Sequence, residues 1–107
     1  MKTKILEILE KHQGRANPIT GRELASLLNQ RGDRQIRLII RELIKEGVPV
    51  ASRTDSPAGY FIVNSYAEAE NYKQSVRGRL IEDAKRIRDF RRAASNHFNK
   101  SHQVVLI

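Results

Sequence analysis

Apolar residues near the start of the chain recur at the three- and four-residue spacing that is typical of short amphipathic helices. The first such segment covers residues 3–12, where the recurring aliphatic residues are Ile5, Leu6, Ile8 and Leu9. Lysine and glutamate occupy most of the remaining positions, so we expect one buried face and one solvated face. The stretch from Gly14 to Pro18 ends this helix.

A second helix is expected from Thr20 to about Asn29. Thr20 and Glu23 have the spacing of a capping box, in which each side chain satisfies an exposed amide at a helix start. The apolar positions that follow have helical spacing and are Leu24, Leu27 and Leu28.

A third helix follows the short break at Gln30-Arg31-Gly32. Asp33 is expected to be its N-cap, and Gly47 is expected to close it as a left-handed C-terminal residue. Its apolar residues form a broad stripe that consists of Ile36, Ile39, Ile40, Leu43 and Ile44.

The next segment has the features of a β-hairpin. Residues 48–53 and 60–63 have strand character, and the residues between them, from Thr54 to Gly59, are rich in turn formers. We therefore expect two antiparallel strands joined by a loop of about six residues.

A long fourth helix is predicted after this hairpin. Ser65 and Glu68 have capping-box spacing, and helical spacing of apolar residues continues to about Ala94. Such a helix would be roughly 40 Å long, more than a small domain can cover. The sequence therefore predicts an α+β domain in residues 1–64, a basic amphipathic helix in 65–95, and a flexible tail with an apolar end in 96–107.

The charge favours a polyanionic partner. The chain has 20 Lys and Arg against 12 Asp and Glu, with a net charge of +8, which points to nucleic acid rather than an acidic small substrate. There is no cysteine, and the three histidines lack ligand spacing, so we expect no disulfide, metal site or cofactor. No apolar stretch is long enough to span a membrane, and a soluble, cytoplasmic protein is expected.

Several motifs together resemble the winged helix-turn-helix of the biotin-repressor type. They are Glu23-Leu24-Ala25, Arg34-Gln35-Ile36-Arg37, Arg41-Glu42-Leu43, Gly47-Val48-Pro49-Val50 and Gly59-Tyr60-Phe61-Ile62. The resemblance covers residues 3–63, and Ala58 stands where the family usually has the first of two wing glycines. The long basic helix after Asn64-Ser65 also resembles that of small winged-helix proteins encoded by phages and prophages.

The resemblance implies binding to double-stranded DNA, with the third helix in the major groove. Its outward polar residues are then candidates for base contacts, namely Arg34, Gln35, Arg37 and Arg41. Residues at the start of the second helix and in the turn are candidates for phosphate contacts, namely Thr20, Arg22 and Arg31. The expected wing contacts are Arg53, Thr54 and Ser56.

The C-terminal part allows several interpretations. The basic helix 66–94 is a solvated surface, a second phosphate-binding surface or a dimer helix. The tail Gln103-Val104-Val105-Leu106-Ile107 resembles the short peptide with which bacterial replication proteins dock on the sliding clamp. Gln103, Leu106 and Ile107 would then bind the partner, although an edge strand is the simpler interpretation.

The leading functional expectation is a non-enzymatic DNA-binding protein of phage-like origin, either a transcriptional regulator or a DNA accessory factor. The alternative is a replication or recombination accessory protein whose tail recruits a replisome component. A winged helix that binds only proteins remains a third class, because a fold does not fix a function.

Overall fold

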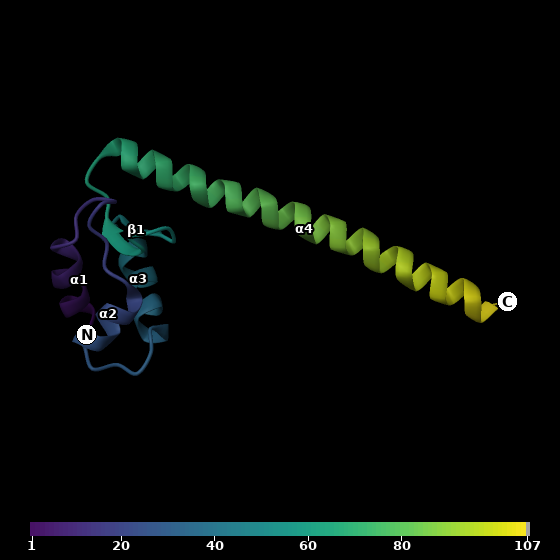
Figure 1. Cartoon of the computed structure of the whole chain (residues 1–107), viewed down its shortest axis with the longest axis horizontal. Coiled ribbons are helices and arrows are strands. Elements are labelled where there is room, and N and C mark those ends of the chain that lie inside the picture. Colours follow the sequence, from purple (N-terminus) through teal and green to yellow (C-terminus); the bar gives the residue numbers. More distant parts are fainter. Residues whose placement is uncertain (107) are drawn as a thin grey trace. The chain divides into compact units, whose positions relative to one another are not determined.

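The chain is α+β, with four helices and one antiparallel hairpin in the part that the structure describes (Figure 1). This computed structural model describes the backbone of residues 1–106 and the side chains of residues 1–99. The elements are α1 (Lys2–Glu10), α2 (Gly21–Leu27), α3 (Arg34–Lys45), β1 (Val50–Arg53), β2 (Gly59–Ile62) and α4 (Tyr66–Leu106). The expected α+β class, hairpin and long C-terminal helix are thus confirmed.

The chain divides into two compact units, the first of which comprises Met1–Tyr72 and holds the apolar core. In this unit α1 packs against α3 and β2, and α3 also contacts α2 and β1. The largest fully buried side chains are Ile5, Leu9, Leu24, Ile36 and Leu43. Each contributes about 1.5–3 kcal/mol by leaving water, so these five residues hold the three helices together.

Two aliphatic residues expected in the core are exposed. Leu27 is 62% exposed and Ile44 is 46% exposed. Ile44 follows the buried Leu43 directly, and successive helical residues point about 100° apart. Leu27 lies in the last turn of a seven-residue helix, where Leu24 and Leu28 make the contacts with the core. The inward-facing stripes are therefore narrower than expected.

The hairpin pairs Val50 with Ile62 at one end and Arg53 with Gly59 at the other. The strand β2 has a second pairing that the sequence does not predict. Ile19 forms an antiparallel bridge with Tyr60 on the other side of β2. The Ile19 N–H donates to the Tyr60 carbonyl at 2.8 Å, and the Tyr60 N–H donates to the Ile19 carbonyl at 2.7 Å. These two bonds fix Ile19, which directly precedes the N-cap of α2, to the hairpin.

Gly59 makes this close pairing possible. Its φ is +136°, and a Cβ at this position would lie 2.4 Å from the Ile19 carbonyl oxygen. A side chain there would therefore be strained and would also overlap the neighbouring backbone. Glycine is required by both the backbone conformation and the available space.

The structure contains one of the predicted N-terminal helix caps as expected and alters two others. The capping box of Thr20 and Glu23 is present. Asp33 is the N-cap of α3, but its side chain makes no capping hydrogen bond and instead pairs with Arg37. At α4, the Glu68 N–H donates to Ser65 Oγ at 3.1 Å, while the Glu68 carboxylate accepts from the N–H of Asn64 rather than that of Ser65.

The helix α4 is longer than expected, because it continues to Leu106 instead of ending near residue 95. Residues 96–106 thus form neither a non-helical tail nor an edge strand. No glycine or proline occurs between Arg79 and Leu106, so the sequence contains no strong helix breaker there. Gln103 and Leu106 lie where side chains are not described, and Ile107 lies outside the described residues.

Candidate nucleic-acid interface

Three arginines form a stripe along α3 on the side away from the core. Arg34, Arg37 and Arg41 are separated by three and four positions, a spacing that places them on one helix face. All three are exposed, whereas Ile36, Ile40 and Leu43 are buried. We call this set the α3 arginine stripe. Gln35 is also exposed, but it directly follows Arg34 and therefore lies on the flank of the stripe.

Arg37 is held near the beginning of α3 by an acidic neighbour. Its Nε lies 3.7 Å from Asp33 Oδ1, and both side chains are largely exposed. Such an exposed pair contributes at most about 1 kcal/mol, so an incoming anion can replace it. The side chains of Arg34 and Arg41 make no hydrogen bond or ion pair with the residues that the structure describes.

The turn between α2 and α3 brings Arg22 and Arg31 to one hollow. This hollow has a volume of about 410 Å³, and its lining also includes Ser26, Gln30, Gly32 and one acidic residue, Asp33. Neither arginine has an internal ion pair within the described residues. Two unpaired guanidinium groups and a serine hydroxyl are suitable donors for a phosphate.

The start of α2, the start of α3 and the strand β2 meet at Gly21. A Cβ added at Gly21 would lie 3.3 Å from Asp33 Cβ and 3.4 Å from Tyr60 Cε2. Burial raises the pKa of the Tyr60 phenol, and the nearby Asp33 carboxylate raises it further. The two helices that carry the exposed arginines are therefore joined to the hairpin through a close contact.

Two predicted contact residues have structural partners instead. The Thr20 hydroxyl accepts from the Glu23 N–H and donates to Glu23 Oε1, each at 3.0 Å. The Arg53 side chain is only 11% exposed, and it donates to the carbonyls of Arg15 and Ser56. Both side chains thus stabilise the fold, and their donor groups already have partners within it.

The hairpin loop is organised around Asp55. Arg53 Nη2 lies 3.0 Å from Asp55 Oδ2, and Arg15 Nη2 lies 3.3 Å from the same oxygen. The hydrogen bond from Arg53 lowers the pKa of the Asp55 carboxyl below its ordinary value. Thr54 and Ser56, the other predicted wing residues, are exposed on either side of Asp55.

Sequence reasoning did not select Lys45 or use Leu38, although both extend the α3 arginine stripe. Leu38 is 47% exposed, and Lys45 is exposed in the last turn of α3. Their positions, four residues after Arg34 and four after Arg41, place them on the same face. Helical spacing already places Leu38 on the outward face, and the same spacing was the signal that could have identified Lys45.

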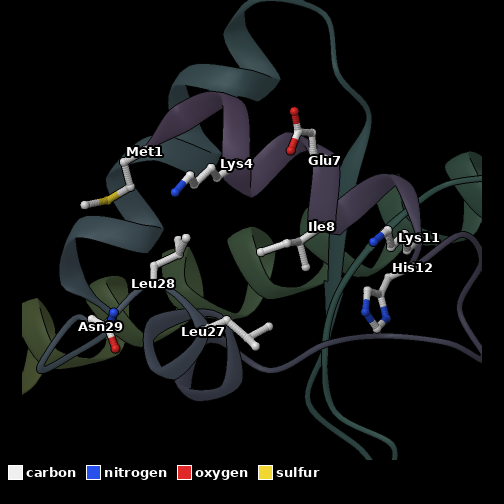
Figure 2. Close-up of a pocket in the computed structure, with 9 residues that line it drawn as sticks. All are labelled: Met1, Lys4, Glu7, Ile8, Lys11, His12, Leu27, Leu28 and Asn29. Carbon is white, nitrogen blue, oxygen red and sulfur yellow. The ribbon is translucent and has the colours of Figure 1, made fainter.

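A second, larger hollow lies between α1 and the end of α2, with a volume of about 680 Å³. Figure 2 shows Ile8 of α1 and Leu27 and Leu28 at the end of α2 around this space. Its remaining lining carries charges of both signs, including Lys4, Lys11 and Glu7, as well as Met1, His12 and Asn29. The apolar floor makes this hollow a poorer site for a polyanion than the α2–α3 surface.

Among the residues that the structure describes, no group of three or more metal-ligating side chains lies close enough to hold an ion, and no helix combines the length and apolar character needed to cross a bilayer. Comparisons with protein-family models, with curated proteins and with solved structures gave no match.

Proposed function

We propose that the first unit is a winged helix-turn-helix that binds double-stranded DNA. In this proposal α2 and α3 are the two helices of the motif, and the β1–β2 hairpin is the wing. The observation that carries it is the α3 arginine stripe, which is exposed and has no role in the core. The net charge of +8 is consistent with a polyanionic partner.

Within this proposal the α3 arginine stripe enters the major groove. Arginine can donate two hydrogen bonds to guanine, and each good pair of bonds is worth about 1–3 kcal/mol of discrimination. Gln35, on the flank of the stripe, would contact an adjacent base, and Leu38 offers an apolar contact to a thymine methyl group.

Arg22 and Arg31 would bind phosphates beside the groove. Phosphate contacts position the protein but carry no sequence information, and each one adds to the salt dependence of binding. Thr54 and Ser56 would bring the hairpin loop to the adjacent backbone or minor groove. Arg53 and Thr20 act indirectly, by fixing the loop and the start of α2.

The proposal separates base-reading residues from phosphate-binding residues, and this separation can be tested with a selected DNA site. Arg34→Ala and Arg37→Ala should each cost about 1–3 kcal/mol and relax the preference at one base position. Arg22→Ala should weaken binding to all sequences alike and reduce the salt slope by about one. Lys4→Ala, which removes an exposed charge from α1 outside the α3 arginine stripe, is the matched control.

The readout is fluorescence anisotropy with specific and scrambled duplexes across a salt series. Equal losses on both duplexes from all three arginine variants would contradict base reading. Losses no greater than that of Lys4→Ala would contradict the interface itself. If base reading holds, the protein is a sequence-specific regulator; if only phosphate binding holds, it is a DNA accessory factor.

A further inference from the structure

The second unit, which begins at Lys73, has an apolar seam along α4. Leu80, Ile87 and Phe90 are 69%, 59% and 73% exposed. Together with Val76, Asp83 and Ala94, these residues follow the alternating four- and three-residue spacing of a coiled-coil helix. We call the following set the α4 seam: Val76, Leu80, Ile87, Phe90 and Ala94.

An uncovered seam of this kind is unfavourable for a helix in water. Large apolar side chains that lie together on one face mark sites of interaction, and most helical stability in proteins comes from packing such a face. Another helix is the natural cover, because the heptad spacing matches the seam of a partner helix.

Basic residues border the seam on both sides. In the heptad register of the seam, positions a are Leu80, Ile87 and Ala94, and positions d are Val76, Asp83 and Phe90. Positions e then include Arg77 and Arg91. Positions g include Arg79 and Arg86. These four arginines are exposed, and none has an internal ion pair within the described residues. Glu82 and Asp89 occupy positions c, away from the seam, where they accompany Lys85 and Arg88.

This arrangement disfavours a second copy of the chain as the cover. In a parallel pair, position g faces position e of the next heptad, so Arg86 would face Arg91 of the other copy. In an antiparallel pair, positions of the same kind face each other, so the arginines at positions g, Arg79 and Arg86, would approach the position-g arginines of the other copy. Like charges oppose pairing in both directions, and the homodimer considered from the sequence is therefore the weaker interpretation.

We propose that the α4 seam docks an amphipathic helix of another protein, one whose own apolar seam is flanked by glutamate or aspartate. Acidic flanks would pair with the four arginines, and charges at positions e and g determine partner choice in coiled coils. A nucleic acid would satisfy the arginines but would leave Leu80, Ile87 and Phe90 in water.

Asp83 adds a further requirement on the partner. It occupies a d position in the middle of the seam, and a polar residue at such a position sets the register of a coiled coil. The partner helix should therefore carry a lysine, arginine or asparagine at the position that faces Asp83.

The test uses the full chain and a pair of synthetic peptides. Each peptide has four heptads, with isoleucine and leucine in the seam and one lysine opposite Asp83. One peptide carries glutamate at positions e and g, and the other carries lysine there. We expect the glutamate peptide to bind at least about tenfold more tightly than the lysine peptide, as measured by fluorescence anisotropy at physiological salt.

Three variants identify the surface. Leu80→Ser combined with Ile87→Ser should abolish binding, and Arg86→Glu should reduce or reverse the preference between the peptides. Arg92→Gln removes a charge at position f, outside the seam, and should leave the affinity unchanged. Circular dichroism of each variant establishes that the helix is retained.

Equal binding of both peptides, or no binding of either, would overturn the proposal. So would sedimentation equilibrium that shows a micromolar homodimer sensitive to Leu80→Ser, because the occupant would then be a second copy. Loss of DNA affinity on Arg86→Gln that matches the loss on Arg37→Ala would assign this surface to nucleic acid. These readouts are separate from those that test α3, so the two proposals can fail independently.

Discussion

Gly59→Ala should be the most damaging glycine substitution in the first unit. The new Cβ would lie 2.4 Å from the Ile19 carbonyl oxygen and 2.8 Å from the Thr20 nitrogen, at a φ of +136°. Backbone strain at such an angle costs about 1–3 kcal/mol for a residue with a side chain. Relief of the overlap breaks the two Ile19–Tyr60 hydrogen bonds, which contribute about 0.5–1.5 kcal/mol each.

The expected loss is therefore about 2–6 kcal/mol, a large part of the stability of a small domain. Urea unfolding followed by far-ultraviolet circular dichroism measures it through the midpoint and slope of the transition. A shift of the midpoint without a change in slope would report stability alone.

Two other glycines separate backbone strain from steric overlap. Gly47 has a φ of +103° but nothing within 4 Å of an added Cβ, so Gly47→Ala should cost only the strain, about 1–2 kcal/mol. Gly32 has open space and no positive φ, so Gly32→Ala should change stability by no more than about 0.5 kcal/mol. If Gly59→Ala were as mild as Gly32→Ala, the bridge between Ile19 and Tyr60 would be wrong.

Three further predictions concern the caps, the loop and α4. Thr20→Ala should cost about 1 kcal/mol in urea unfolding without changing DNA affinity, whereas a loss of affinity in a fully folded variant would restore Thr20 as a phosphate contact. Arg53 lowers the pKa of the Asp55 carboxyl, so the contribution of Asp55 to stability is complete when the pH is above the ordinary aspartate pKa and is lost as the pH falls through the lower pKa of the folded state. Carboxyl NMR titration should show this pKa rising in Arg53→Gln. An unchanged pKa would refute the contact. Gly78 has open space around an added Cβ, so Gly78→Ala should stabilise the helix by about 0.5–1 kcal/mol. Circular dichroism should show this as increased helical ellipticity. No increase would indicate that α4 is interrupted at residue 78.

Features that depend on neighbouring residues in the sequence could be predicted well. The Thr20 and Glu23 capping box needs only one turn of chain, and Gly47 closes α3 with a φ of +103°. The buried residues Ile36, Ile40 and Leu43 follow from helical spacing alone. The arginines of α3 could also be predicted to point outward, because they occupy the opposite side of the same helix.

Features that depend on tertiary contacts could not be predicted in the same way. The bridge between Ile19 and Tyr60 joins segments that are distant in sequence, and no local pattern marks Ile19 as a pairing residue. The sequence predicts Arg53 as a solvent-exposed wing residue, but its guanidinium donates hydrogen bonds to the Arg15 carbonyl and to the Asp55 carboxylate. The polar residues from Asn96 to Ser101 favour a helix end near residue 95, but no glycine or proline follows Gly78 and α4 continues to Leu106.

The central claim is that the first unit reads DNA through α3, and selection from a random double-stranded library tests it most directly. The full chain is incubated with the library at about 100 mM salt, a concentration at which non-specific phosphate binding is weakened, and the bound fraction is sequenced. The account predicts an enriched motif whose preferred bases change in Arg34→Ala and Arg37→Ala but not in Arg22→Ala. Retention of DNA without an enriched motif would contradict base reading, and no retention by the folded protein, even at low salt, would contradict DNA binding itself.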